Sequence, residues 1–135
     1  MQDNPYELPK DLPVPADDGA ADHLLGMKVP SIALMSTAQR LVNLADVSER
    51  QRTVVYCYSL TGALDEALPA RWNEIPGARG CTPQSCAFRD HFSELQTLNT
   101  QVFGLSTQTT AYQREFAQRI HLPYELLSDS KLAFT

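Results

Sequence analysis

The chain has 135 residues, enough to bury one hydrophobic core and too few for two domains of ordinary size. Hydrophobic residues make up 43% of it, and 16 acidic residues against 11 scattered Lys and Arg residues give a formal net charge of −5. This balance excludes the concentrated basic surface that attracts nucleic acids or anionic membranes. Because no apolar run approaches membrane-spanning length either, we expect no nucleic acid and no membrane as partner.

Residues 1–22 differ in composition from the rest of the chain. They contain four prolines and several aspartates, which oppose helix formation and contribute little to a core. We expect an extended N-terminal arm here and a single domain over residues 23–135. The first residues lack the charged and then apolar regions of a signal peptide, and the 3 cysteines fit a reducing compartment. We therefore expect a cytoplasmic location.

Three segments after the arm predict strands. Residues 29–35 and 41–44 flank a turn and predict a short hairpin-like pair, followed by a weak helical turn at about 46–51. Residues 54–58 form a continuous apolar run with β-branched residues, which is typical of a strand buried on both faces. We expect this strand at the centre of a sheet and Cys57 within it as an inert buried thiol.

Two helices are predicted beyond this strand from apolar residues at helical spacing. These residues are Phe88, Phe92 and Leu95 in the first helix, and Tyr112, Phe116 and Ile120 in the second. Thr109 or Thr110 can cap the second helix, and the apolar run at 102–105 between the helices predicts another buried strand. The order strand, helix, strand, helix favours parallel neighbouring strands with right-handed crossovers.

Two cysteines lie five positions apart at the start of the first helix, in the run Gly80-Cys81-Thr82-Pro83-Gln84-Ser85-Cys86-Ala87-Phe88-Arg89-Asp90. The preceding glycine, with Pro83 in the first turn, predicts that the helix begins at or beside Cys81. A thiol there meets unpaired backbone N–H groups and the positive end of the helix dipole, and both favour the nucleophilic thiolate. Cys81 is therefore a candidate nucleophile, with core packing of both thiols as the structural alternative.

The spacing of the two cysteines implies a conformational step. Positions i and i+5 of an ideal helix have Cα atoms roughly 8.6 Å apart, which is beyond the distance that a disulfide tolerates. Joining Cys81 to Cys86 therefore requires the first turn to unwind.

The cysteine run resembles the active-site segment of the peroxiredoxins of the bacterioferritin comigratory protein type, also called PrxQ. Residues 54–58, 102–106 and 126–129 match the strand before that segment, the strand after its helix and the stretch that opens the next helix. The resemblance thus runs from about Met27 to the last residue. It implies a thioredoxin-like α/β fold, a mixed sheet flanked by helices.

The resemblance also implies a thiol-dependent peroxidase. Cys81 would be the peroxidatic cysteine, which reduces hydrogen peroxide or an organic hydroperoxide and becomes a sulfenic acid. Cys86 would resolve it by closing an intramolecular disulfide, which thioredoxin or a similar thiol reductant then reduces. Thr82 is expected as a supporting hydroxyl, and Arg79 or the more distant Arg89 as a candidate thiolate stabiliser. No metal or organic cofactor is expected, because sulfur carries the oxidising equivalents.

The sequence departs from the family pattern near the first cysteine. The family usually places a proline and a threonine ahead of it, and here those positions hold Ser59 and Ala78. An extra segment, at about 63–78, forms an inserted loop, and we expect Thr61 to return to the pocket from its far side. Trp72 is expected to pin this loop onto the body of the domain, with lining of a substrate entrance as the alternative.

The family's catalytic arginine belongs to a strand that would follow residue 135. The chain therefore resembles a domain that lacks its C-terminal strands and helix, with a helix only starting at Ser128 or Asp129. We expect a fragment that leaves the strand at 54–58 with a free apolar edge, self-associates through it and is a poor peroxidase. The missing threonine and strands keep a second function open, a non-catalytic redox sensor or adaptor switched by the same disulfide. A zinc site of Cys81, Cys86 and His91 is not expected, because no further cysteine pair completes it.

Overall fold

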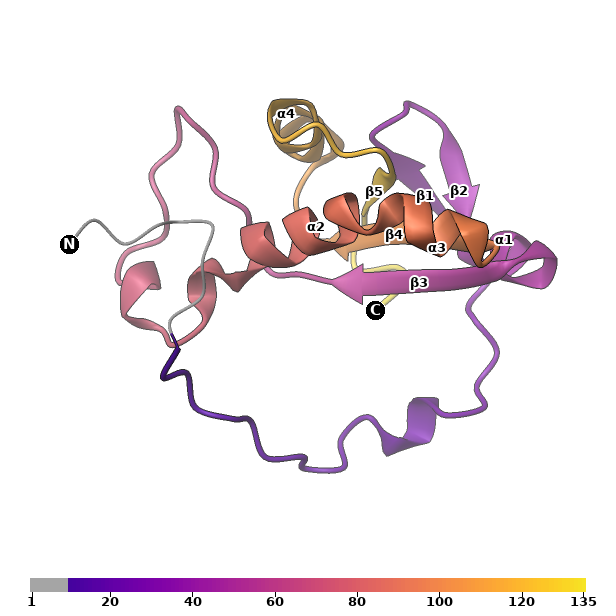
Figure 1. The fold of residues 1–135 in the computed structure, drawn as a ribbon, viewed down its shortest axis with the longest axis horizontal. Coiled ribbons are helices and arrows are strands. Elements are labelled where there is room, and N and C mark those ends of the chain that lie inside the picture. Colours follow the sequence, from indigo (N-terminus) through magenta and orange to yellow (C-terminus); the bar gives the residue numbers. More distant parts are fainter. Residues whose placement is uncertain (1–9) are drawn as a thin grey trace.

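The computed structural model describes residues 10–135. Within them the chain forms a five-stranded sheet in the order β2-β1-β5-β4-β3, with helices packed against it (Figure 1). The strands are β1 (Ala33–Ser36), β2 (Leu41–Asn43), β3 (Arg52–Cys57), β4 (Thr100–Ser106) and β5 (Glu125–Ser128). The helices are α1 (Leu44–Arg50), α2 (Cys81–Asp90), α3 (Phe92–Thr97) and α4 (Thr110–Arg119), with short 3-10 turns η1 (Asp22–Leu24), η2 (Trp72–Glu74) and η3 (Ala78–Gly80).

The sheet is mixed. β3, β4 and β5 run parallel to one another, whereas β1 pairs antiparallel with both β2 and β5. The predicted hairpin and the predicted parallel pairing across the first helix are therefore confirmed. β3 and β4 pair along their length, from Arg52 opposite Thr100 to Cys57 opposite Leu105. The chain thus leaves β3 for the cysteine helix at the same edge of the sheet where β4 ends.

β3 lies at the edge of the sheet in residues 10–135, so the free edge expected from the family resemblance is confirmed, and the central position predicted from the apolar run is wrong. Tyr56 is buried, but Val54 and Val55 are only half-buried and Cys57 is exposed. The reason is that β3 has β4 on one side and no strand of the described chain on the other. The prediction of a buried Cys57 fails for the same reason, although partial burial still raises the pKa of its thiol. Self-association through this open edge stays a prediction.

β5 corrects the prediction for the end of the chain. We expected residues 126–129 to open a helix, and they form a strand between β1 and β4 instead. Successive side chains of a strand point to opposite faces, and both Leu126 and Leu127 are fully buried. Leu126 packs in the core on one face of the sheet and Leu127 in the core on the other, which favours a strand over a helix at β5. The expected helix from Ser128 or Asp129 does not form within the described residues.

The helices follow the predicted spacing with two changes. The first predicted helix is interrupted at His91, which separates α2 from α3. The second, α4, is capped by Thr109, whose hydroxyl accepts a hydrogen bond from the Tyr112 backbone N–H at 3.3 Å. Its predicted core residues Phe116 and Ile120 are buried, whereas Tyr112 is only half-buried.

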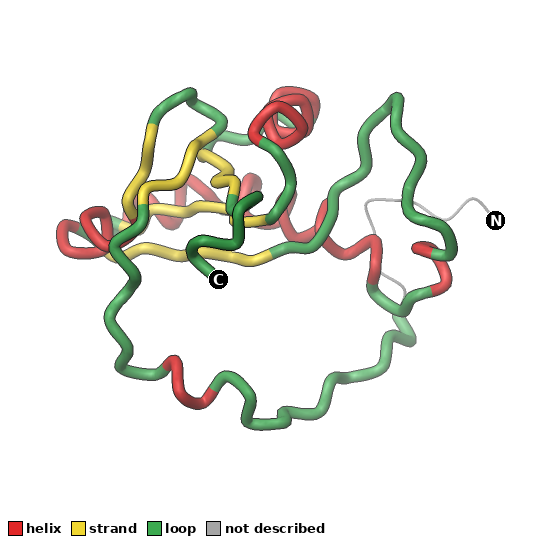
Figure 2. The backbone as a smooth tube through the Cα atoms, turned by 180° about the vertical axis from the view of Figure 1, so that it is seen from behind, coloured by secondary structure: helices red, strands yellow, loops and turns green. Residues whose placement is uncertain are grey.

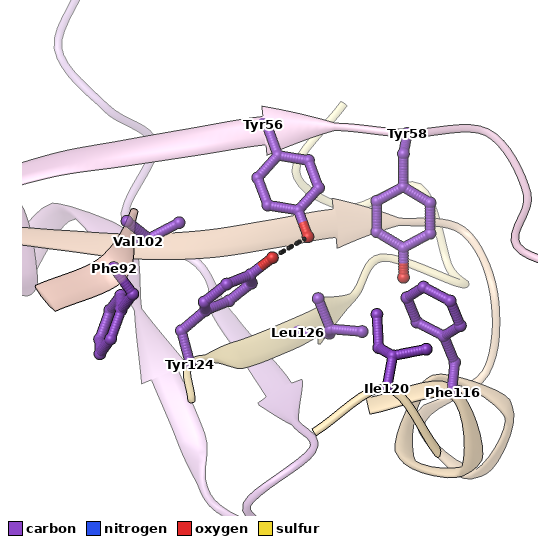
Figure 3. Packing of buried hydrophobic residues seen from close by; sticks show 8 residues of the cluster. All are labelled: Tyr56, Tyr58, Phe92, Val102, Phe116, Ile120, Tyr124 and Leu126. Carbon is purple, nitrogen blue, oxygen red and sulfur yellow. Dashed lines mark hydrogen bonds between the residues drawn. The ribbon is translucent and has the colours of Figure 1, made fainter. Parts of the chain in front are cut away.

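Two hydrophobic cores lie on opposite faces of the sheet. The first, which we call the α2-side core, is drawn in Figure 3 and consists of Tyr56, Tyr58, Phe92, Val102, Phe116, Ile120, Tyr124 and Leu126, with both α2 cysteines packed against it. The second, the α1-side core, consists of Leu34, Val42, Leu44, Phe103, Leu105 and Leu127. The cysteine helix thus belongs to one core only.

Residues 10–30 run as a loop at a distance from the sheet (Figures 1 and 2). Residues 13–31 are exposed throughout, with η1 as a single turn. The first nine residues of the expected arm lie outside the described part of the chain. None of the helices in residues 10–135 is long and apolar enough to cross a membrane.

Asp129 organises the last described turn. Its carboxylate accepts hydrogen bonds from the backbone N–H groups of Ala133, Phe134 and Thr135 at 2.8 to 3.0 Å, and from the Thr135 hydroxyl at 3.0 Å. Burial alone raises the pKa of this carboxyl, but the hydrogen bonds to its charged form outweigh burial and leave the pKa below its ordinary value of 3.8.

A lowered carboxyl pKa makes stability depend on pH in a defined direction. The ionised Asp129 contributes stability above pH 3.8, and this contribution is lost as the pH falls through the folded-state pKa. Asp129→Asn should lower the free energy of unfolding by about 1 to 3 kcal/mol at neutral pH, and the difference from wild type should shrink in acid. Urea unfolding at several pH values measures this. Asp65→Asn in the exposed loop is the control, and an equal loss in both variants would contradict the assignment.

Candidate functional site

The cysteine helix begins as predicted, with Cys81 as its first residue. The 3-10 turn η3 leads directly into it, because Gly80 already has helical φ and ψ angles. No side chain in residues 10–135 caps this end of α2. The first backbone N–H groups of the helix therefore remain available to a negative charge at the thiol.

Ser59 is a site residue that the sequence did not point to. Its hydroxyl oxygen lies 3.6 Å from the Cys81 sulfur, and the Cys81 side chain is half-buried. When the sulfur is a thiolate, only the hydroxyl has a proton to donate, so Ser59 can then donate a hydrogen bond to it. The one signal in the sequence was that Ser59 occupies the family's usual proline position.

The second cysteine sits on the same intact helix. Cys86 is half-buried, and both it and Cys81 are free thiols. A groove of about 430 Å³ runs past it, lined by Arg89, Arg119 and His121 among others. Because α2 is helical from residue 81 to residue 90, the unwinding that we expected for a disulfide has not taken place in this structure.

Three buried side chains tie α2 to the sheet, and we call them the hydroxyl cluster: Tyr56, Ser85 and Tyr124. The Tyr56 hydroxyl donates to Ser85 Oγ at 3.0 Å and lies 2.9 Å from the Tyr124 hydroxyl, the contact drawn in Figure 3. Tyr124 donates to the Ser85 carbonyl at 2.8 Å, and Ser85 Oγ donates to the Cys81 carbonyl at 2.9 Å. The cluster therefore holds the helical turn that lies between the two cysteines.

The other predicted side chains take up different positions. Thr61 is fully buried, and its N–H and hydroxyl both donate to Gln108 Oε1 at 3.2 Å. These hydrogen bonds go to Gln108 and not to Cys81. Arg89 donates to Asp90 at 2.9 Å and to the Ile120 carbonyl at 2.9 Å. It is an arginine held by structural partners.

A pocket of about 340 Å³ adjoins the start of α2. The inserted loop forms one wall of it, with Trp72 half-buried there. Thr82, next to Cys81, and Arg79, which donates to Asn73 at 2.8 Å, complete the predicted residues in its lining. The remaining lining residues are Leu60, Gly62, Ala63, Leu64, Leu68, Ala78 and Arg119. The structure thus brings Arg79, Thr82 and Trp72 together beside the candidate nucleophile.

Arg119 is a second residue that the sequence gave no reason to choose. It lines both the pocket beside Thr82 and the groove beside Cys86. It donates to the Gly62 carbonyl and to Glu115, each at 2.7 Å, and so ties helix α4 to the inserted loop. Residues 10–135 contain no group of three or more His, Cys, Asp or Glu side chains placed to hold a metal ion.

The model of the AhpC/TSA family matches residues 74–135, which include α2 and both of its cysteines. The chain belongs to this family. Among its AhpC/TSA relatives, it is 30% identical over 129 residues to peroxiredoxin bcp1 of Schizosaccharomyces pombe, covering 94% of this chain and 58% of that protein. It is 35% identical over 104 residues to the chloroplastic peroxiredoxin Q of Oryza sativa subsp. japonica, covering 77% of this chain and 41% of that protein. The chain thus spans about half the length of these relatives.

Solved structures show the fold of this AhpC/TSA chain. Peroxidoxin BcpB from Mycobacterium tuberculosis superimposes with a TM-score of 0.64 at 23% identity, over 81% of this chain and 61% of that one. Peroxiredoxin Q from Xanthomonas campestris gives a TM-score of 0.60 at 17% identity, with the same coverage of 81% and 61%. The predicted thioredoxin-like α/β fold is confirmed.

The Ser59 contact can be tested without any peroxide. Ser59→Ala removes the hydroxyl that can donate to the Cys81 sulfur, and alkylation of Cys81 by iodoacetamide at neutral pH should slow by about two- to ten-fold. Peptide mass spectrometry over time measures the rate. Cys57 in the same sample is the internal reference, since it lies on exposed β3. An unchanged ratio of the two rates would show that the contact does not influence the sulfur.

Proposed function

We propose that this chain carries the thiol centre of a peroxidase that reduces hydrogen peroxide or an organic hydroperoxide. The observation that supports it most is the position of Cys81, half-buried at an uncapped helix start with the Ser59 hydroxyl 3.6 Å away. Family membership supports the same reaction class. Since the chain covers 58% or less of the relatives described above, the activity of the whole protein is part of the proposal.

The proposed reaction begins at sulfur. The Cys81 thiolate attacks the terminal oxygen of the hydroperoxide, so that an S–O bond forms as the O–O bond breaks. The departing alkoxide or hydroxide takes up a proton and leaves as an alcohol or water. Sulfur loses two electrons to the peroxide and becomes a sulfenic acid. The helix N–H groups and Ser59 stabilise the negative charge, with Thr82 and Arg79 at the adjoining pocket.

Resolution then regenerates the enzyme. Cys86 attacks the sulfenic sulfur of Cys81, an S–S bond forms and water leaves. A dithiol such as thioredoxin reduces this disulfide by exchange and is itself oxidised. The reaction needs no metal or organic cofactor, because every electron passes through sulfur. A cytoplasmic location is part of the proposal, and the rice relative is chloroplastic by name.

Thiol mapping tests the assignment of the two cysteines. One equivalent of peroxide should consume Cys81 and Cys86 together as a disulfide and leave Cys57 free, because the raised pKa of Cys57 disfavours its thiolate. Cys86→Ser should still consume one equivalent and accumulate a sulfenic acid at Cys81, whereas Cys81→Ser should not react. Peptide mapping and first-turnover kinetics measure both. A disulfide that contains Cys57, or equal first-turnover rates in the two variants, would refute the assignment, and slow oxidation without turnover would favour the redox sensor.

The pocket beside α2 predicts which part of the protein meets the organic group of a substrate. Trp72→Ala removes the largest apolar side chain of the inserted loop from the pocket lining. The first-turnover rate constant with cumene hydroperoxide should fall by about ten-fold, and that with hydrogen peroxide should change little because it carries no organic group. Leu98→Ala is the control, because this exposed leucine follows the last residue of α3 and does not line the pocket. Equal losses with both peroxides would contradict a role in substrate selection.

A further inference from the structure

Unwinding of α2 has to break the hydroxyl cluster. Ser85 is the residue just before Cys86, and its Oγ donates to the carbonyl of Cys81 at 2.9 Å. The same Ser85 accepts from Tyr56 at Oγ, 3.0 Å away, and from Tyr124 at its carbonyl, 2.8 Å away. All three side chains of the cluster are buried. Bringing the two sulfurs together moves Ser85 and so leaves the two phenols without their partner on the helix.

The two phenols come from the sheet side of the cluster and not from the cysteine helix. Tyr56 lies on β3, and Tyr124 immediately precedes β5. Tyr56 also stacks on Phe88 of α2, with ring centroids 4.8 Å apart, and meets Tyr124 edge-on at 6.0 Å. The sheet therefore holds the middle of the cysteine helix through polar and aromatic contacts at once.

The hydroxyl cluster has fewer protons than hydrogen-bond contacts, and both of its phenols stay protonated. Three hydroxyl protons serve four contacts, so one of the two phenol protons is shared between two acceptors. Burial raises the pKa of both Tyr56 and Tyr124 above the ordinary value of 10.0. Both phenols consequently stay protonated at physiological pH and keep donating to the helix. When the helix opens in the wild type, buried donors lose their acceptors, which is costly, whereas a variant without the phenol hydroxyl has no such donor to leave unpaired.

We propose that the hydroxyl cluster is a latch that sets how readily α2 opens, and thereby how fast Cys86 reaches the oxidised Cys81. Tyr56, Ser85 and Tyr124 are positioning residues in this proposal, because they act on the cysteines through the helix. The kinetic consequence rests on the proposed function. A slowly opening latch lengthens the life of the sulfenic acid, so that a second peroxide can oxidise it to the sulfinic acid before Cys86 arrives, with a second alcohol or water released.

The test compares Tyr124→Phe with Tyr58→Phe in the full chain. Tyr124→Phe keeps the ring and removes the donor to the Ser85 carbonyl. Tyr58 is also a buried tyrosine of the α2-side core, but within residues 10–135 its hydroxyl makes no hydrogen bond to α2 and faces Ser106 and Gln113 instead. Removing that hydroxyl should leave opening of α2 unchanged, which makes Tyr58→Phe a matched control. Ser85→Ala serves as a second latch variant if Tyr124→Phe does not fold.

The first readout is hydrogen exchange of the reduced protein, which involves no peroxide. Amides of residues 81–87 should exchange about 5- to 30-fold faster in Tyr124→Phe, while those of β4 stay as in wild type. A merely structural role for the phenol would accelerate both segments together. Equal acceleration in the two segments, or none at 81–87, would overturn the proposal, as would the same selective change in Tyr58→Phe.

The second readout is the fate of Cys81 under excess peroxide. The ratio of disulfide to sulfinic acid, measured by mass spectrometry, should rise by a similar factor in Tyr124→Phe. An unchanged ratio would overturn the latch. If Cys81 fails to react with peroxide in every variant, the proposed function is wrong, and the exchange result alone then decides whether the latch exists.

Discussion

The position of Gly104 in β4 is the constraint on which the arrangement around α2 depends. It lies opposite Tyr56 in the register of β3 and β4. A Cβ atom added at Gly104 would approach the Tyr56 ring and hydroxyl to 2.8 Å and Leu126 to 2.5 Å, closer than real Cβ atoms come to other heavy atoms. Only glycine therefore lets the Tyr56 side chain lie across β4 toward Tyr124. From there a single phenol contacts the sheet and the cysteine helix together.

Local signals account for what the sequence predicted well. The start of α2 at Cys81 follows from a glycine and a proline within three positions of it, and the cap of α4 from Thr109. The hairpin and β4 follow from short apolar runs between turn residues. Arg79 and Thr82 lie within two positions of Cys81 in the sequence, Trp72 was expected to pin the inserted loop or to line an entrance, and all three line one pocket.

The features that the sequence did not predict depend on contacts between residues far apart in the chain. The apolar run at 54–58 predicted a central strand, and its free edge was expected only from the family resemblance, because no residue within the segment records which strands flank it. Residues 126–128 form a strand because both faces of the sheet are covered at that point. Ser59 is separated from Cys81 by the inserted loop, and Tyr124 from Ser85 by 39 positions. Such pairs have no periodicity, so only the folded chain shows them.

The sheet separates the two hydrophobic cores, so that one core can open locally while the other stays packed. Leu34, Val42, Leu44, Phe103, Leu105 and Leu127 contact one another on the face that α2 never touches. The proposed opening of the cysteine helix would therefore leave this packing and the β3-β4-β5 ladder intact. Each cycle of the proposed reaction would then require one helix to refold onto an existing sheet, and not the whole domain to fold again. Repeated opening of α2 would then depend on the α2-side core, and resistance to global unfolding on the α1-side core across the sheet.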